Sequence, residues 1–427
     1  MSIPSRTSAS NSSIVSLEFL NLSYLVPAHT EWKSRQVEEN YVDKDGKLHS
    51  FYRTENYPEY VPDHDVPYVT VGVQFQWFDT KTGKLVASSE DVRRRNSESN
   101  PSSVYNRIID WQTTRHDWPE LTRDMIGYEN GVHGGITSTI QVLTEPGDAV
   151  LVHSPTYPGF IGDLSNTGRH VVFSPLRKEK GIWRMDFADM EEKIKKHHVH
   201  LAIFCSPQNP TGRVWERWEI EQAMALFKKY DVLVISDEIW SDIIFQGHCH
   251  IPTAAVSEDA RQRTVAFYAP SKTFNLAGLI GSYHIIANPL LREKVTQHGQ
   301  RTCYNEMNVL SMHALIGAYS QDGHEWTDEL NQVLESNCRY AVQYIQNHFP
   351  GCQVSLPQGT YMLFVECGEY LKANQMTLPE LLKKAWDVGV AWQDGRKFAW
   401  KDAMRLNLAL PRTRLEEAMR RLSEYVF

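Results

Sequence analysis

The sequence predicts an α/β fold, with a mainly parallel sheet in a large domain and a smaller α+β domain. Between residues 148 and 268, short apolar runs alternate with segments of helical pattern. The apolar runs are continuous, which is typical of strands buried on both faces of a parallel sheet. The length of 427 residues is sufficient for two domains.

The amino-terminal part of the chain has a different pattern. Residues 1–13 are rich in serine and are expected to form a disordered tail. An irregular, aromatic stretch follows, and two of its segments, 41–48 and 75–86, resemble hairpins because turn residues interrupt strand-like runs. A helix is expected over 104–116.

The expected elements of the rest of the chain follow from the same periodicities. The sheet strands are expected at 148–152, 170–173, 201–204, 232–235 and 264–268, with a helix over 217–230. The carboxyl-terminal part is expected to contain a helical stretch over 305–349, strands at 353–354, 361–366 and 404–409, and a helix from Arg414. The expected domains are an N-terminal arm with part of the small domain (14–60), a large domain (61–305) and a small domain (306–427).

Charge and cysteine content exclude several classes of protein. A net charge of -8 and a pI near 6.1 argue against a nucleic-acid-binding surface. The six cysteines include no C-x-x-C pair, so reduced thiols are expected rather than a disulfide framework or a zinc site. The sequence has neither the apolar run of about 18 residues that a membrane span requires nor a signal-peptide core. A cytoplasmic protein is expected.

Polar clusters directly follow three of the expected strands. Asn209 lies in the cluster after 201–204, Asp237 follows 232–235, and Lys272 follows 264–268. Each residue alone has an ordinary explanation: a turn, a helix cap or a surface lysine. Because ligands of parallel α/β sheets bind at the carboxyl ends of the strands, the three together indicate a site. An amine, a carboxylate and an amide are what a heteroaromatic aldehyde cofactor would require.

These clusters resemble those of fold-type I enzymes that depend on pyridoxal 5′-phosphate (PLP). The strings SPQNPTGRVW (206–215), SDEI (236–239) and APSKTFNLAGL (269–279) are most similar to the aminotransferase-like cystathionine β-lyases of the MalY/PatB family. GTY (359–361) and RLN (405–407) extend the resemblance, which runs from about Trp111 to the carboxyl terminus. It implies a seven-stranded sheet, PLP as the cofactor and a homodimer.

The resemblance also implies roles for individual residues. Lys272 would bind PLP as a Schiff base and then act as the general base at Cα. Asp237 would keep the pyridine nitrogen protonated, which sustains the electron-sink chemistry of the cofactor. Tyr157 would stack on the ring, and Asn209 would donate to the phenolic oxygen beside the substrate. Arg405 would bind the substrate α-carboxylate bidentately.

A second group of residues is implied to hold the cofactor phosphate. Gly134, Gly135 and Ile136 precede an expected helix over 137–143, whose first N–H groups would bind the anion. Ser271 would add a hydroxyl group. Tyr105 lies where the family has a tyrosine that reaches the phosphate across the dimer interface.

The sequence departs from the family pattern at three places. Trp240 stands at a cofactor-binding position where relatives have His or Tyr, and an indole can donate a hydrogen bond but not accept one. Gly134-Gly135 replaces a Pro-Ala-type pair, which we expect to leave more room near the phosphate. An Asp-Met-Asp-Phe-like signature, which borders the substrate entrance in the family, is replaced by residues 66–77, with an enlarged flanking segment. We therefore expect a bulky substrate, such as a cysteine conjugate of natural-product metabolism.

Several functions remain open from the sequence. The leading hypothesis is C–S β-elimination, which converts an S-substituted cysteine into a thiol, pyruvate and ammonia. Aminotransfer and decarboxylation-coupled oxidative deamination would use the same Lys272, Asp237 and Arg405. A PLP-fold regulator would require a DNA-binding extension, which the sequence does not contain. A non-catalytic scaffold would not require Lys272, Asp237 and Arg405 together.

Overall fold

The computed structural model describes residues 14–26, 29–42, 48–61, 64–78, 85–89 and 101–427, with side chains from Val104 onward. The chain divides into two compact units, Met1–Ser99 and Asn100–Phe427, and each is described by itself.

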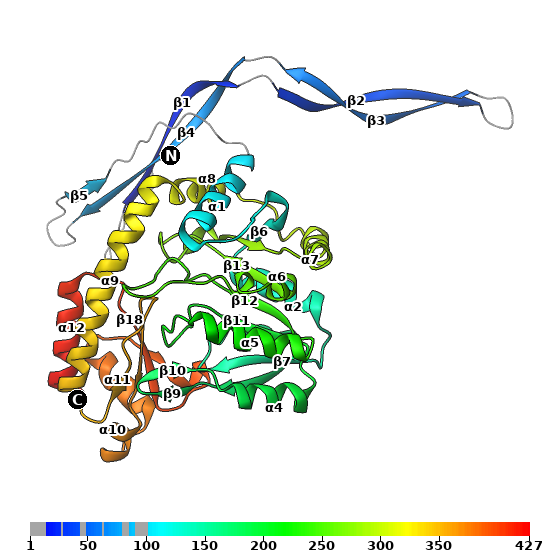
Figure 1. Ribbon diagram of the computed structural model, residues 1–427. Coiled ribbons are helices and arrows are strands. Elements are labelled where there is room, and N and C mark those ends of the chain that lie inside the picture. Colours follow the sequence, from blue (N-terminus) through cyan, green and yellow to red (C-terminus); the bar gives the residue numbers. More distant parts are fainter. Residues whose placement is uncertain (1–13, 27–28, 43–47, 62–63, 79–84, 90–100) are drawn as a thin grey trace. The chain divides into compact units, whose positions relative to one another are not determined.

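The first unit consists of antiparallel strands. Its strands are β1 (Ile14–Val26), β2 (His29–Val42), β3 (Leu48–Val61), β4 (His64–Phe78) and β5 (Leu85–Ser89). β2 and β3 form a two-stranded ribbon, and β4 pairs with both β1 and β5 (Figure 1). Both expected hairpins are confirmed by the β2–β3 and β4–β5 pairings, whereas their turns, and the expected tail over 1–13, lie outside the described residues. The strands are much longer than the sequence pattern indicated.

The second unit contains a seven-stranded sheet in the order β6-β14-β13-β12-β11-β7-β8. Its strands are β6 (Ile126–Asn130), β7 (Ala149–Ser154), β8 (His170–Pro175), β11 (Leu201–Cys205), β12 (Leu233–Asp237), β13 (Thr264–Tyr268) and β14 (Gly281–Ile285). The strands are parallel except for β14, which runs antiparallel to both neighbours. The expected mainly parallel sheet is confirmed.

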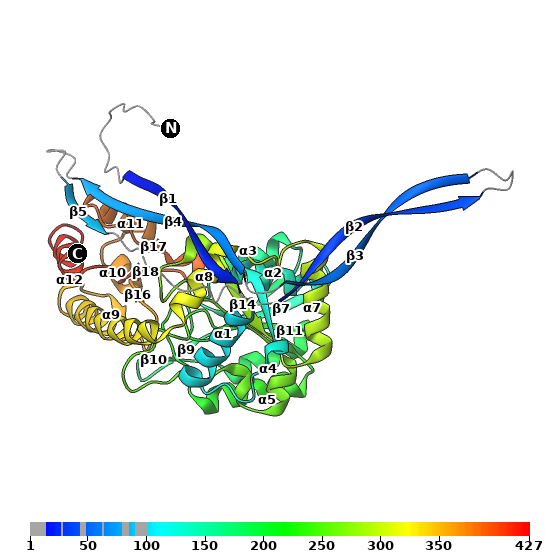
Figure 2. The ribbon, with the colours of Figure 1, turned by 90° about the horizontal axis from the view of Figure 1, so that it is seen from above.

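Helices cover both faces of this sheet. On β11, Ala202 and Phe204 pack in one core cluster with α4 and α5, whereas Leu201 and Ile203 pack in another with α2, α3 and α7. Figure 2 shows α2 and α3 on one side of the sheet and α4 and α5 on the other. The helices of this part of the chain are α1 (Pro101–His116), α2 (Val132–Leu143), α3 (Pro158–Asn166), α4 (Phe187–His197), α5 (Arg217–Lys229), α6 (Glu258–Arg263) and α7 (Pro289–Arg301). Burial on both faces explains the continuous apolar runs.

The carboxyl-terminal part is α+β, as expected. Its four-stranded sheet has the order β15-β16-β18-β17, with β15 (Gln353–Val354), β16 (Met362–Glu366), β17 (Gln393–Asp394) and β18 (Ala403–Asn407). The helices are α8 (Val309–Ala318), α9 (Gln321–His348), α10 (Gly368–Ala373), α11 (Leu378–Asp387) and α12 (Arg412–Tyr425). The expected stretch over 305–349 is therefore two helices, because Ser320 caps α9 and accepts a hydrogen bond from Gly323 N.

Short elements complete the second unit. A small hairpin is formed by β9 (Arg177–Glu179) and β10 (Ile182–Arg184), and four 3-10 turns lie at Arg123–Met125, Thr253–Ala255, Ala277–Leu279 and Gly395–Phe398. The division of the chain at residues 60 and 305 stays a prediction. Among the described residues, the helices are all too short or too polar to cross a membrane.

We expect a buried histidine in β7, His153, to make the fold sensitive to acid. His153 packs between Phe204 and Trp215, at ring-centroid distances of 5.9 and 6.2 Å, and its Nε2 has no partner. Burial lowers its pKa to about 4, although the charge of Asp189 opposes the shift. Between pH 6.5 and 4 the unfolded chain binds a proton that the folded chain does not, so stability falls as the pH falls. We expect this residue to cost about 2 kcal/mol of unfolding free energy at pH 5 relative to pH 7.5.

Urea unfolding of the wild type and His153→Phe at both pH values measures this cost. The variant is expected to lose about 2 kcal/mol less between the two pH values than the wild type does. His170→Gln, a change at an exposed histidine that begins β8, provides the control. If the wild type and His153→Phe lose equal unfolding free energy between the two pH values, His153 is not the source of the acid sensitivity.

Candidate functional site

The structure brings the three strand-end clusters together at one edge of the sheet. Cys205 and Asp237, the last residues of β11 and β12, are direct neighbours in the parallel register. Beyond the strands, Ser206 N donates to Asp237 O at 2.9 Å, and Glu238 N donates to Phe267 O at 2.9 Å. The loop with Asn209 and the turn with Lys272 therefore begin beside Asp237, as expected from the sequence.

Asp237 is a buried carboxylate with few partners. Its Oδ1 accepts a hydrogen bond from Ile239 N at 3.2 Å. Burial raises the pKa of Asp237 to about 6, against the opposing effects of this N–H group and the Lys272 charge. A cation beside this carboxylate would relieve its desolvation. The protonated nitrogen of a pyridine ring fits that requirement.

The adjacent carboxylate, Glu238, has the opposite environment. Its two oxygens bind four groups, which are Ser236 Oγ (2.8 Å), Thr253 N (3.0 Å), His250 Nε2 (2.8 Å) and Tyr268 Oη (2.6 Å). Burial alone would raise the pKa of Glu238, but the hydrogen bond and charge of His250, with the other donors, place it below its ordinary value. Glu238 is saturated, so Asp237 is the carboxylate left available for a ligand.

Lys272 lies in the turn after β13 and is half-buried. Its Nζ lies 5.6 Å from the centroid of the Trp240 ring. Burial lowers the pKa of Lys272; the charge of Asp237 opposes this shift, and that of Arg405 adds to it. A lowered pKa increases the fraction of free amine, the form that attacks an aldehyde or removes a proton.

Arg405, on β18, has no carboxylate partner among the described residues. Its Nη1 donates to Asn209 Oδ1 at 2.7 Å, its Nη2 donates to Gln393 Oε1, and its Nε is buried without a partner. The guanidinium carbon lies 4.5 Å from the Phe398 ring centroid. Burial lowers the pKa of Arg405 to about 10, although Tyr157 and Tyr361 oppose the shift. A desolvated guanidinium without an anion is a site for a carboxylate ligand.

Aromatic rings lie around these charged groups. Tyr157 caps α3, and burial raises its pKa; the negative charge of Asp237 adds to the rise and Arg405 opposes it. Trp240 and Tyr361 form an edge-to-face pair with centroids 4.7 Å apart. The predicted residues Asn209, Asp237, Lys272, Arg405, Tyr157 and Trp240 thus share one site, although their individual roles stay predictions.

Gln393, Tyr361 and Phe398 were not identified as site residues from the sequence. Gln393 faces Arg405 across the β17–β18 pair, so a correct pairing of these short strands could have found it. Phe398 ends a 3-10 turn that directly follows β17.

The structure corrects the expected start of the helix at the predicted phosphate site, whose role stays a prediction. α2 begins at Val132 rather than residue 137, with Gly131 (φ 87°) as its cap, so Gly134 and Gly135 lie inside its first turn. Gly135 N already donates to Gly131 O at 3.0 Å. The N–H groups of the first three helical residues remain available for an anion. The role of Ile136, whose side chain is buried in the core, stays a prediction.

The two glycines do not leave additional room, and that expectation is wrong. A Cβ atom on Gly134 would overlap the hydroxyl group of Tyr304, which donates to Gly131 O at 2.9 Å. A Cβ atom on Gly135 would lie 2.6 Å from Phe267 Cε1. The residues are glycines because neighbouring aromatic rings pack directly on the helix backbone.

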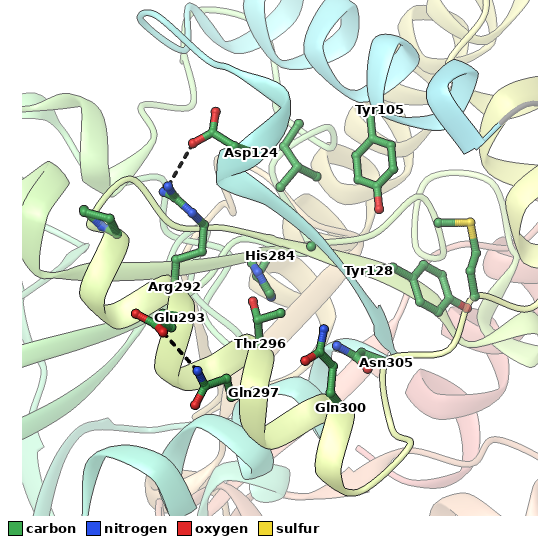
Figure 3. A pocket seen from close by; sticks show the side chains of 14 residues that line it. Tyr105, Asp124, Tyr128, His284, Arg292, Glu293, Thr296, Gln297, Gln300 and Asn305 are labelled. Carbon is green, nitrogen blue, oxygen red and sulfur yellow. Dashed lines mark hydrogen bonds and ion pairs between the residues drawn. The ribbon is translucent and has the colours of Figure 1, made fainter. Parts of the chain in front are cut away.

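The structure places Ser271 beside Lys272, where its carbonyl accepts from Leu276 N at 3.0 Å. Tyr105 instead lines a pocket with Tyr128, His284 and residues of α7 (Figure 3). The lining of that pocket includes none of the predicted strand-end residues. The expected reach of Tyr105 to a phosphate of a second subunit stays a prediction.

Comparison with known proteins gives the family. Residues 99–422 match the model of "Aminotransferase class I and II". The chain belongs to this family. Cystathionine beta-lyase PatB of Bacillus subtilis (strain 168) is 33% identical over 74% of this chain and 81% of its own length. Protein MalY of Escherichia coli (strain K12) is 31% identical over 73% of this chain and 79% of its own.

A solved structure agrees with this assignment. The PLP-bound putative aminotransferase from Clostridium difficile 630 has a TM-score of 0.72 and 34% identity, over 77% of this chain and 84% of its own. The fold-type I architecture and the resemblance to the MalY/PatB family, both expected from the sequence, are confirmed.

Proposed function

We propose that this protein is a PLP-dependent C–S β-lyase that converts an S-substituted cysteine into a thiol, pyruvate and ammonia, as a homodimer in the cytoplasm. The observation that carries the proposal is a set of three partly desolvated ionisable groups, Asp237, Lys272 and Arg405, in one site. Burial raises the pKa of Asp237 to about 6, Arg405 has no carboxylate partner among the described residues, and burial lowers the pKa of Lys272. Similarity to PatB, a cystathionine beta-lyase, supports the choice of reaction.

PLP, when bound, supplies an electrophilic aldehyde and a ring that accepts electrons from Cα. The residues of the chain bind and orient the substrate and transfer its proton. Arg405 binds the substrate α-carboxylate and thereby sets which Cα bond faces Lys272. The free amine of Lys272 removes the Cα proton, and Asp237 holds the proton on the ring nitrogen. The thiolate then leaves from Cβ, and addition of water to the remaining fragment gives pyruvate and ammonia.

We further propose that the substrate carries a bulky apolar group on sulfur, as in a conjugate of natural-product metabolism. Three aromatic side chains support this: Tyr361 and Trp240 in mutual contact, and Phe398 under Arg405. Stacking and edge contacts with such rings favour an aromatic or apolar substituent. Trp240 can donate a hydrogen bond but cannot accept a proton, so we assign it to binding rather than to proton transfer.

Aminotransfer is the second candidate, and the similarity to a putative aminotransferase favours it. It would use the same three residues but would return the amino group to a keto acid. The two reactions therefore differ in products rather than in the residues that begin them.

Product analysis with purified holoprotein distinguishes the two functions. We expect S-benzylcysteine, without added keto acid, to give equal amounts of thiol, pyruvate and ammonia. We also expect its kcat/KM to exceed that of cystathionine by about tenfold or more, because apolar contacts discriminate on this scale. S-methylcysteine provides the matched small substrate. Amino-group exchange that requires a keto acid and releases no thiol would favour aminotransfer, and equal kcat/KM values would contradict the bulky substrate.

A further inference from the structure

Another buried carboxylate, Asp242, binds the residue next to Lys272. Its Oδ2 accepts a hydrogen bond from Thr273 Oγ1 at 3.0 Å, and its Oδ1 accepts from His116 Nε2 and Trp111 Nε1, each at 2.9 Å. All four residues are buried. Asp242 takes no part in the chemistry proposed above, so this arrangement requires another explanation.

Thr273 is held on two sides. While its hydroxyl group donates to Asp242, its carbonyl oxygen accepts from Trp326 Nε1 at 3.0 Å. The surrounding turn is closed by a bond from Phe274 N to Pro270 O at 2.9 Å. The backbone that bears Lys272 is therefore tied to α1 through Asp242 and His116, and to α9 through Trp326.

Burial and hydrogen bonding have opposite effects on the pKa values of the groups in this network. Burial lowers the pKa of His116 although Asp242 opposes the shift; the nearby His250 and Arg115 lower it further. Burial would raise the pKa of Asp242, but the hydrogen bond and charge of His116 bring it below its ordinary value. Asp242 is therefore an anion that accepts from His116 Nε2, Trp111 Nε1 and Thr273 Oγ1. The anion then accepts strongly from Thr273.

We propose that His116, Asp242 and Thr273 are positioning residues that orient Lys272 for proton transfer at Cα. The inference rests on the proposed function, because it takes Lys272 as the base. A displacement of about 1 Å in a reacting group can reduce a rate by about 10²-fold. Fixing the backbone next to the lysine restricts such displacement without contact with the substrate.

Three threonine variants test the proposal. Thr273→Val removes the hydroxyl group at nearly constant volume, and Thr273→Ser retains it. Thr327→Val is the control for loss of a buried hydroxyl group, since the buried Thr327 hydroxyl donates to Gly323 O at 2.7 Å within α9. For each holoprotein, kcat, KM and the midpoint of the pH titration of the visible spectrum are measured, and urea unfolding reports the stability.

For Thr273→Val we expect kcat to fall about tenfold while KM stays within about twofold, since only the placement of the base changes. We also expect the pH midpoint of the visible spectrum to move by at least about half a unit. The free energy of such a shift is within the net contribution of one hydrogen bond. Thr273→Ser is expected to behave as the wild type, and Thr327→Val to lose stability alone.

The outcomes separate this proposal from the proposed function. A wild type without a cofactor spectrum or turnover would overturn the function itself. A normal wild type with unchanged kcat and midpoint in Thr273→Val would overturn the positioning role alone. Equal loss of kcat in Thr327→Val would also overturn it, because the effect would then reflect stability.

Discussion

Replacement of Lys272 by alanine is expected to remove the visible absorption of the PLP-loaded protein and to reduce turnover by about 10³-fold or more. The side chain has two functions in the proposed reaction, covalent attachment of the cofactor and removal of the Cα proton. Its lowered pKa, caused first by burial, increases the fraction of nucleophilic amine. Spectra of the variant with excess PLP, and pyruvate release, measure the two losses separately.

Lys229→Ala is the control for this variant. Lys229 is an exposed lysine at the end of α5 that pairs with Glu191, and its loss should leave both readouts unchanged. A Lys272→Ala protein that keeps the spectrum and the turnover of the wild type would show that another amine binds the cofactor. The assignment of the site would then be wrong.

The buried sheet was largely predictable from the sequence. Strands β11 and β13 lie within one residue of their expected positions, because burial on both faces requires an unbroken apolar run. Asn209, Asp237 and Lys272 were found for the same reason, since each follows such a strand. The apolar runs therefore locate both the strands and the polar residues that follow them.

The errors occur where distant residues decide the local structure. Gly134 and Gly135 indicated a break before a helix, but the rings of Tyr304 and Phe267 pack on them inside α2. Tyr304 is separated from Asn130, a residue it contacts, by 174 positions. A sequence pattern contains no sign of such a contact.

The groups that orient the site residues were equally hidden. Asp242 and His116 are 126 positions apart, and neither belongs to a motif with a chemical role. Gln393 contacts Arg405 only because two short strands pair. The sequence therefore predicts which polar groups meet at the strand ends, whereas the contacts that hold them depend on the folded chain.

Asp237→Asn is expected to change stability and activity in opposite directions. Burial raises the pKa of Asp237 to about 6 from 3.8 in the unfolded chain, so at pH 7 the folded state holds a destabilised anion. The folded chain binds more protons between these values, and stability falls as the pH rises through them. Removing the charge should stabilise the cofactor-free protein at pH 7 by up to about 3 kcal/mol, an effect that should disappear below pH 4.

In the loaded enzyme the same substitution removes the anion that we propose to hold the ring proton. We expect kcat to fall by about 10²- to 10³-fold, as for the loss of one preorganised electrostatic contact. Urea unfolding of the cofactor-free protein at pH 7 and pH 4, together with turnover of the holoprotein, measures both effects, and Asp387→Asn at an exposed position of α11 is the control. A variant that is less stable than the wild type at pH 7 would show that the buried anion of Asp237 is not destabilising. A variant as active as the wild type would show that the Asp237 charge has no role in the reaction.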